Sequence, residues 1–476
     1  MMLTDRLKGS VMLSNRKSIR MFVFSTLMVG TMACVTHKTT QHSHKELTQV
    51  ESFSESGSIK SPDRWWQSFD SSELDDLIAE ALSNNLDLQQ AWSRLAQVEA
   101  LHRKVRSSRL PGVDLGVSGS NSDRVSGDSP AVDSYRASLD LSYQLDLWGK
   151  IRAHVDQGFY DLQASRKDME ATALTLSGQV ARIWLNLTEQ QLMQKLVEEQ
   201  IQVSRDYLKL VEKRFALGSA TATEVLQQRL ELQSSQNKLP AIEGAIAQLK
   251  NQMALLLGKA PGKDTPELVA AFPTLPELPQ TGIPADLLRR RPDIRATEYR
   301  LFSSEMGLIA ARADLYPRIS LSASLSSSST KFSDLLDNWL RNLAVNLMAP
   351  LFDGGKRRAE VDRNRALVDQ RLQEWKKAVL TSILEVEDAL VIEQTQSQTL
   401  TGIRQQVELA ERTLSRARKS YINGLSSYLT VLTSLQALQN LQQSQIKAEK
   451  DLLANRVSLY LALGGNWTET MTLTQR

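Results

Sequence analysis

The sequence has few of the residues on which most catalytic sites depend. Its 476 residues include one cysteine and five histidines, and three of those histidines stand close together near the N-terminus. A single cysteine cannot form an internal disulfide. Gly354–Lys356 lacks the upstream glycine spacing of a phosphate-binding loop, and it matches Trp148–Lys150 elsewhere in the chain. With no catalytic constellation and no cofactor motif, the sequence argues against an enzyme.

Glycine, proline and aromatic residues are also scarce. The chain has 22 glycines and 13 prolines, and only 6% of its residues are aromatic. Long stretches are instead rich in Leu, Gln, Ala, Glu and Arg, a composition that favours long helices. The length is sufficient for two or three domains.

The N-terminal segment, residues 1–33, is cationic and then apolar. Five basic residues against Asp5 give a net charge of +4, and the apolar run Met21–Ala33 follows. This order is typical of a secretory signal peptide, and the run is shorter than the roughly 20 residues that span a bilayer. Removing +4 from the total of +3 leaves a mature chain of −1. Such a chain has no basic excess with which to bind nucleic acid.

Cys34 lies directly after this segment, where a bacterial lipoprotein is cleaved and acylated. The alternative is a free thiol just inside a leader. Val35 follows in place of the aspartate associated with retention in the inner membrane, which favours the outer membrane. From Val35 to Ser61 the chain is polar without an apolar period, and this predicts a flexible tether. The tether histidines have no cysteine or acidic cluster to complete a metal site.

The rest of the chain is a tandem repeat. Adding 206 to each residue number of the first half aligns it with the second, from Asp87 with Asp293 to Gly258 with Gly464, without a gap. The matches fall together at the expected element boundaries, as in the pairs Pro111/Pro317, Gly149/Gly355, Lys150/Lys356 and Gly218/Gly424. Each half is therefore expected to form the same unit of helix, two strands and a long helical hairpin.

The first copy begins with an amphipathic pattern that predicts a helix from Ser72 to Arg109, ended by Pro111. In residues 135–145 every odd position is apolar or aromatic and every even one is polar, which is typical of a strand with two unlike faces. The partner strand and the second copy repeat this alternation at residues 113–117, 319–325 and 343–347. Strands of this kind fit a membrane barrel.

Four strands cannot close a barrel by themselves, and open sheet edges are not tolerated in lipid. If the strands span a membrane, several chains must therefore contribute to one barrel. The other interpretation of the same pattern is an ordinary half-buried hairpin.

The longest helices follow each strand pair. Residues 153–210 contain no proline and predict about 85 Å of helix. In the second copy, apolar residues step by three and four from Leu400 to Tyr421, which is the pattern of a coiled coil. Gly218 and Gly424 interrupt these helices and predict sharp hairpin tips. Pro240 is expected to kink the first returning helix.

These patterns divide the chain into six parts. We expect a lipoprotein signal peptide at 1–33, a polar tether at 34–61 and a first repeat at 62–258. An inter-repeat linker at 259–284, a second repeat at 285–464 and a C-terminal tail at 465–476 complete the chain.

Several ordered motifs resemble one family. They are Trp65-Trp66, Leu74–Ile78, Asn85–Leu88, Asp146–Lys150, Leu239–Ala241, Ile283–Ile294, Pro350–Gly355 and Leu461–Trp467. Across Asp63 to Trp467 the chain resembles the TolC-like outer membrane efflux proteins, in particular the lipid-anchored branch that serves resistance-nodulation-division (RND) pumps. Ile283–Ile294 is the most specific of these motifs.

The resemblance implies a homotrimer in the outer membrane of a Gram-negative bacterium. Four strands per chain would form one twelve-stranded barrel, continued by a helical tunnel through the periplasm. It also implies that the tips dock onto a periplasmic membrane fusion adaptor, which connects the duct to an inner membrane RND-type pump. The residues concerned are Gly218, Ser219, Ala220 and Thr221 in the first tip and Gly424, Leu425, Ser426 and Ser427 in the second.

One departure from the family concerns the periplasmic gate. Relatives often have an acidic ring just after the second tip glycine, and the corresponding positions here are Thr430 and Thr433. We therefore expect closure by helix packing and hydrogen bonds. The tips also differ, because Ser219 stands where the second copy has Leu425.

The resulting hypothesis is a passive export duct for small toxic molecules. One alternative within export is the outer membrane duct of an ABC-driven type I protein secretion system. An alternative of another class is a non-transporting periplasmic coiled-coil adaptor or scaffold, which explains the hairpins but not the four amphipathic strands.

Overall fold

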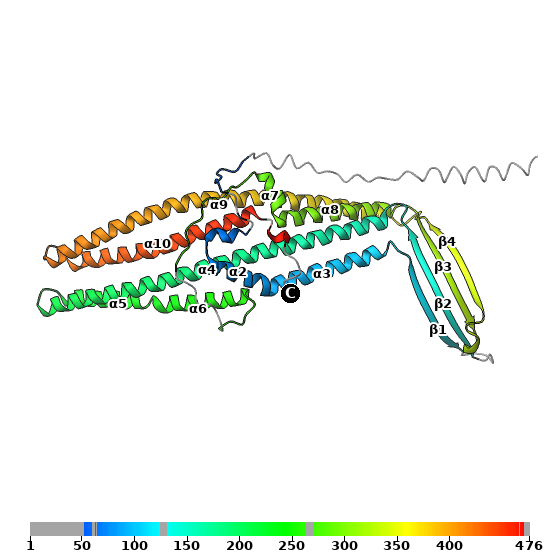
Figure 1. Cartoon of the computed structure of the whole chain (residues 1–476), viewed down its shortest axis with the longest axis horizontal. Helices are drawn as coiled ribbons and strands as arrows, with labels where there is room; N and C mark the ends of the chain where they lie inside the picture. Colours follow the sequence, from blue (N-terminus) through cyan, green and yellow to red (C-terminus); the bar gives the residue numbers. More distant parts are fainter. Residues whose placement is uncertain are drawn as a thin grey trace, which may run out of the picture.

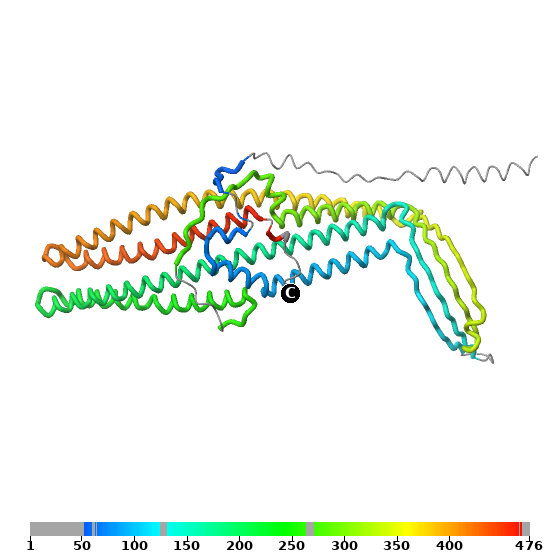
Figure 2. Tube along the Cα trace, in the orientation of Figure 1, coloured from blue at the N-terminus to red at the C-terminus, as the bar shows by residue number. Residues whose placement is uncertain are grey.

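The computed structural model describes residues 52–59, 62, 64–123, 131–262, 271–465 and 467–470. Long helices run along the molecule, and a four-stranded sheet lies at one end (Figure 1). The turns that join α4 to α5 and α9 to α10 lie together at the opposite end (Figure 2). The elements in chain order are η2 (Trp65–Phe69), α2 (Ser72–Asn84), α3 (Leu86–Ser107), β1 (Gly112–Ser122), β2 (Val132–Leu145), α4 (Lys150–Ala216), α5 (Ala222–Gln236), α6 (Leu239–Leu256), α7 (Pro284–Arg290), α8 (Pro292–Ala313), β3 (Arg318–Ser329), η3 (Phe332–Asp334), β4 (Trp339–Met348), α9 (Lys356–Ile422), α10 (Tyr428–Leu463) and η4 (Trp467–Thr470).

The element boundaries confirm the duplication. Helices α3 and α8 begin and end at residues that differ by 206, and α4 and α9 do the same with 67 residues each. The first residues of the returning helices α5 and α10, Ala222 and Tyr428, differ by the same number. The shift read from the sequence is therefore also the shift between structural units.

The single helix predicted from Ser72 to Arg109 is in fact two helices. Asn85 separates α2 from α3, and its side-chain oxygen accepts the backbone N–H groups of Asp87 and Leu88 at 3.0 Å each. Its amide nitrogen donates to the carbonyl of Leu256 at 3.0 Å. An asparagine that caps the second helix replaces the continuing helix, and it also fastens this corner to the end of α6.

Pro240 breaks the first returning helix rather than kinking it. Helix α5 ends at Gln236 and α6 begins at Leu239, so Pro240 lies in the first turn of a new helix. A proline is tolerated there because the first N–H groups of a helix have no intrahelical acceptor. The second repeat has Ile446 at the matching position, and α10 runs unbroken for 36 residues.

The four strands form one antiparallel sheet in the order β1-β2-β3-β4. Leu139 pairs with Leu115 on one side and with Leu325 on the other, so the odd-numbered apolar residues share one face. The side chains of Leu115 and Val345 on this face are more than two-thirds exposed. The opposite face is polar and rich in serine. The alternation predicted from the sequence is confirmed.

Helix α4 is the central element of the helical body, and it contacts α2, α3, α5, α6, α8 and α10. The main core lies near the middle of the molecule, where Trp65 stacks on Tyr460 with ring centroids 5.9 Å apart. Trp467, at the start of the C-terminal tail, packs edge-on against Trp66 at 4.9 Å. No helix among the described residues has both the length and the apolar character to cross a membrane.

The end of the predicted tether belongs to the packed body. The side chain of Phe53 is buried in a cluster with Leu287 and Trp375. The backbone N–H of Ser54 donates to the carboxylate of Glu387 at 3.1 Å, and residue Ile59 pairs with Pro279. The flexible tether predicted to reach Ser61 is therefore corrected for residues 52–59. Cys34, the signal peptide and the tether histidines lie outside the described residues.

Candidate functional site

The two hairpin tips have the same backbone geometry. Gly218 and Gly424 adopt left-handed conformations with φ of 71° and 75°. Around Gly218, the N–H of Ser219 donates to the carbonyl of Arg214 at 2.8 Å, and around Gly424 the N–H of Leu425 donates to the carbonyl of Ser420 at 2.9 Å. This is the Schellman arrangement for ending a helix, in which glycine avoids the clash of a Cβ atom. Both predicted turns are present.

The residues after each glycine begin the returning helices in different ways. The hydroxyl of Thr221 caps α5 by accepting the N–H of Glu224 at 3.3 Å, whereas Ser427 at the start of α10 makes no such cap. Ala220 packs against the apolar cluster of the tips. The hydroxyl of Ser426 has no hydrogen-bond partner among the described residues.

Each tip exposes one leucine beside its glycine. Leu217 precedes Gly218 and Leu425 follows Gly424, and each leucine side chain is 80% exposed. Leu425 was expected among the docking residues and Leu217 was not, because the expected docking residues begin at each glycine and Leu217 precedes Gly218. Both tips therefore have an exposed leucine, before the glycine in the first tip and after it in the second.

A polar link joins the two hairpins just behind the tips. The guanidinium of Arg214 lies 4.4 Å from the ring centre of Tyr421, and it donates to the carbonyls of Tyr421 and Ile422 at 3.3 Å each. The hydroxyl of Tyr421 donates to the carboxylate of Glu224 at 3.0 Å. Burial, together with the hydrogen bond and the charge of Glu224, raises the pKa of Tyr421 to about 12. The phenol therefore stays a neutral donor near pH 7.

A second contact lies one turn further in. The buried hydroxyl of Tyr428 donates to the side-chain oxygen of Gln228, whose amide nitrogen donates to the carbonyl of Ser204 at 2.8 Å. Burial and the neighbouring Tyr421 raise the pKa of Tyr428, so it also remains protonated. Together these contacts connect α4 and α5 of the first hairpin to α9 and α10 of the second.

The predicted gate residues Thr430 and Thr433 lie on α10 beside this link. Both are exposed, and the hydroxyl of Thr433 donates to the carbonyl of Leu429 on its own helix at 3.0 Å. The hydroxyls of Thr430 and Ser427 are 3.5 Å apart. Their role in a gate stays a prediction. The sequence did not predict the residues that join the hairpins, although Tyr421 is the last residue of the predicted coiled-coil pattern. These residues are Arg214, Tyr421, Glu224, Gln228 and Tyr428.

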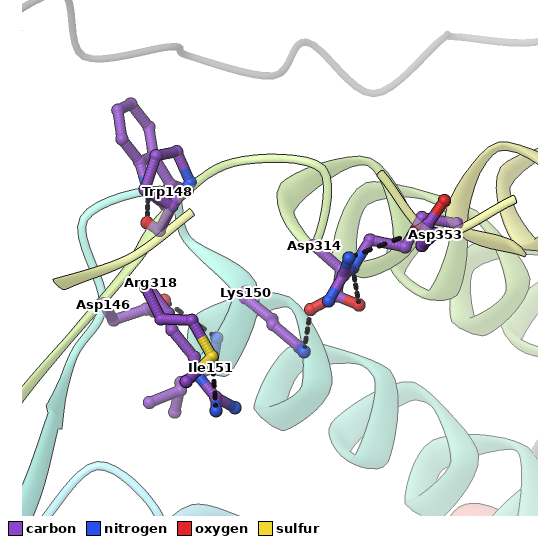
Figure 3. Close-up of polar contacts among 10 residues, drawn as sticks. Asp146, Trp148, Lys150, Ile151, Asp314, Arg318 and Asp353 are labelled. Carbon is purple, nitrogen blue, oxygen red and sulfur yellow. Dashed lines mark hydrogen bonds and ion pairs between the residues drawn. The ribbon is translucent and has the colours of Figure 1, made fainter. Parts of the chain in front are cut away.

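At the other end of the helices, ion pairs join the helix ends that lie next to the sheet (Figure 3). The carboxylate of Asp314, directly after α8, accepts hydrogen bonds from Lys150 at 2.5 Å and from Arg357 at 3.4 Å, so one carboxylate holds the first turns of both α4 and α9. Burial raises the pKa of Asp314, but the hydrogen bond and charge of Lys150 and the charge of Arg357 outweigh it, and the pKa is lowered. The indole of Trp148 donates to the carbonyl of Pro317 at 2.6 Å.

The two corners use different carboxylates. Asp146 accepts the N–H groups of Ile151 and Arg152 at 2.9 and 2.7 Å and so caps α4. Asp353 accepts the N–H of Gly355 at 3.1 Å. The two Gly-Lys motifs are therefore strand-to-helix corners, from β2 to α4 and from β4 to α9. Within the described residues, no group of three or more His, Cys, Asp or Glu side chains is placed to hold a metal ion.

The family assignment follows from the two repeats. A family model described as "Outer membrane efflux protein" matches residues 77–259 and, a second time, residues 283–465. The chain belongs to the outer membrane efflux protein family. The first and last residue numbers of the second matched range exceed those of the first by 206, which is the shift found in the sequence and between the helices.

Curated relatives match most of this efflux protein. The pyoverdine export outer membrane protein OpmQ of Pseudomonas aeruginosa is 34% identical over 416 residues, which cover 85% of this chain and 87% of OpmQ. The toluene efflux pump outer membrane protein TtgI of Pseudomonas putida is 32% identical, covering 82% and 85% of the two chains. The probable outer membrane lipoprotein SilC of Salmonella typhimurium is 27% identical, covering 85% and 88%.

Solved structures of outer membrane channels match the fold. The outer-membrane channel OprN superimposes with a TM-score of 0.81 at 27% identity, covering 89% of this efflux protein and 96% of OprN. CusC gives a TM-score of 0.80 at 26% identity, covering 87% and 96%. The chain is thus an outer membrane efflux protein with the channel fold.

Proposed function

We propose that three copies of this chain form the outer membrane duct of a tripartite efflux system, with Cys34 acylated as a lipid anchor. The four-stranded sheet carries the proposal. It has an exposed apolar face, an opposite polar face and two open edges, β1 and β4. Lipid does not tolerate open edges, so the sheet needs further copies to close. Three copies supply twelve strands, within the range of membrane barrels.

The proposed cargo is a class of small toxic molecules. The names of the relatives describe pyoverdine export and toluene efflux. The duct is passive in this proposal, and an inner membrane RND-type pump supplies the gradient. A periplasmic membrane fusion adaptor connects the pump to the duct by docking on the tips, where Leu217 and Leu425 offer exposed apolar contacts.

The gate in this proposal is the set of contacts behind the tips. The Arg214–Tyr421–Glu224 link holds the two hairpins of a chain together, and opening the periplasmic end requires the hairpins to separate. The adaptor would open the duct by binding the tips and replacing these contacts. Thr430 and Thr433 line the same region in the proposal and contribute hydroxyls rather than a ring of charge.

Replacing Tyr421 by Phe should make the duct leak. The substitution keeps the ring against Arg214 but removes the hydrogen bond to Glu224, which contributes about 1 kcal/mol to the hairpin contact. We expect greater ion conductance of the purified protein in planar bilayers and greater sensitivity of cells to large antibiotics that normally do not cross the outer membrane. Tyr316→Phe, at the sheet end of the molecule, is the matched control. Equal conductance of the two variants would contradict the gate.

Two measurements test the duct itself. A strain that lacks the chain should become several-fold more susceptible to some members of a panel of chemically diverse toxicants, and the intact gene should restore resistance. The protein extracted from outer membranes should migrate as a trimer in detergent and shift to the monomer on heating. Unchanged susceptibility across the panel would contradict efflux, and a monomer before heating would contradict the shared barrel.

A further inference from the structure

The duplication makes the contacts inside one chain a template for the contacts between chains. Six repeat units would surround the axis of a trimer, and neighbouring units would be related in nearly the same way throughout. Within a chain, the first unit meets the second through β2 with β3 and through α4 with α8. Between chains, the second unit would meet the next first unit through β4 with β1 and through α9 with α3. This step rests on the proposed trimer.

We propose that adjacent protomers join in the register obtained by shifting the β2–β3 pairing by one repeat length. Tyr135 pairs with Ser329 inside the chain. Adding 206 to the first number and subtracting it from the second places Arg341 of β4 opposite Asp123, one residue beyond β1, of the neighbouring copy. The same shift turns the pair Ala137 and Ser327 into Leu343 opposite Asn121 and the pair Leu141 and Ala323 into Leu347 opposite Val117.

The register resolves an unusual feature of the apolar face. Arg341 lies in the row that contains Leu115, Leu139 and Leu325, and it is exposed without an ion pair to any described residue. Asp123 is likewise exposed and has no such partner. The proposed pairing of β4 with β1 of the neighbouring copy places these opposite charges directly across from each other, where cross-strand Cβ atoms are about 5 Å apart. The matching pair inside the chain, Tyr135 with Ser329, is uncharged, so this complementarity is not a copy of the internal contact.

A second charge pair appears at the level of the helices. Inside the chain, Arg300 of α8 forms an ion pair with Asp168 of α4. The shift replaces these residues by Arg94 of α3 and Glu374 of α9, so an Arg–carboxylate pair is present again. Arg94 is exposed and forms no ion pair within the described part of its own chain, while Glu374 accepts hydrogen bonds from Gln370 and Arg371 on its own helix. Two levels of the molecule therefore give the same interface.

The proposed interface between protomers is not uniform along its length. At the junction of sheet and helices, Lys150 is paired with Asp314 inside the chain. The shifted positions are Lys356 and Ser108, which cannot form an ion pair. The contacts between protomers should consequently depend on the Arg341–Asp123 and Arg94–Glu374 pairs above and below this level.

Cysteine cross-linking measures the register. Asn121→Cys combined with Leu343→Cys should give covalent dimers and trimers on non-reducing gels after mild oxidation or treatment with a short bifunctional thiol reagent. Asn121→Cys with Leu347→Cys moves the second thiol four positions along β4, about 13 Å away, and should remain monomeric. The parent chain, with Cys34 alone, gives the background. A trimer that cross-links through the displaced pair but not through the first overturns the register while leaving the duct intact.

Charge reversal measures the pairs. Arg94→Glu or Glu374→Arg should each lower the temperature at which the detergent-solubilised trimer dissociates, and the double reversal should restore most of the loss. Arg341→Glu with Asp123→Arg should behave in the same way. If the dissociation temperature of both double variants falls by the sum of the two single losses, the pairing is overturned. A parent protein that never forms a trimer overturns the register and the proposed function together.

Discussion

Gly424→Val should abolish export while leaving the trimer assembled. Gly424 has a φ of 75°, and a Cβ added there meets no atom within 4 Å. The cost is therefore backbone strain rather than a clash. A left-handed conformation costs an ordinary residue about 1–2 kcal/mol, and a β-branched residue tolerates it least. We expect the turn to rearrange and to move the exposed Leu425 away from its docking position.

The measurement pairs drug susceptibility with the amount of trimer in the outer membrane. Gly402→Val is the matched control, because Gly402 lies within α9 and an added Cβ there also meets nothing within 4 Å. Its helical backbone accepts valine, so export should persist. Normal export by Gly424→Val, at a normal level of trimer, would show that the second tip does not dock as proposed.

Among the substitutions proposed for this protein, Arg456→Met should cause the largest loss in the free energy of unfolding. The guanidinium of Arg456 bonds the carboxylate of Glu393 at 2.6 Å, and the two side chains are only 3% and 11% exposed. Arg456 also donates to the carbonyl of Pro276, so it fastens the inter-repeat linker to the second hairpin. Removing one partner of a buried pair leaves an uncompensated charge and costs about 3–5 kcal/mol. We expect a clear fall in the melting temperature of the purified protein.

Two variants separate this effect from a general loss of charge. Arg404 and Glu449 form a pair between the same two helices, α9 and α10, at 2.9 Å, but the arginine side chain is 58% exposed. Arg404→Met should cost at most about 1 kcal/mol. Arg456→Met combined with Glu393→Leu should recover most of the stability, because neither charge then remains buried. A double variant as unstable as Arg456→Met would mean that the loss comes from packing.

Much of the fold could be predicted because its signals are local. The alternation of residues 135–145, the glycines of the two tips and the proline-free stretches each act over short distances along the chain. The two errors in the helices came from the same short-range signals. The local sequence around an asparagine or a proline does not show whether a helix continues with a bend or ends and restarts there. Asn85 also fastens this corner to the carbonyl of Leu256, a contact 171 residues away that no local pattern indicates.

The link behind the tips could not be predicted in the same way. Arg214 and Tyr421 are 207 residues apart, and nothing near either residue names the other as its partner. The repeat does not help, because it relates equivalent positions, whereas the link joins the end of α4 to the end of α9 across the hairpins. Only their packing brings the guanidinium over the phenol ring.

The sequence by itself determined the repeat, the strand faces, the hairpin turns and the family, because periodicity and turn chemistry are properties of neighbouring residues. It also determined that one chain has too few strands to close a barrel. The tertiary structure alone decided which charges are buried together, which residues connect the hairpins and where the tether end packs. Those contacts depend on the relative positions of whole helices. These positions are set by the packing of side chains that are far apart in the chain.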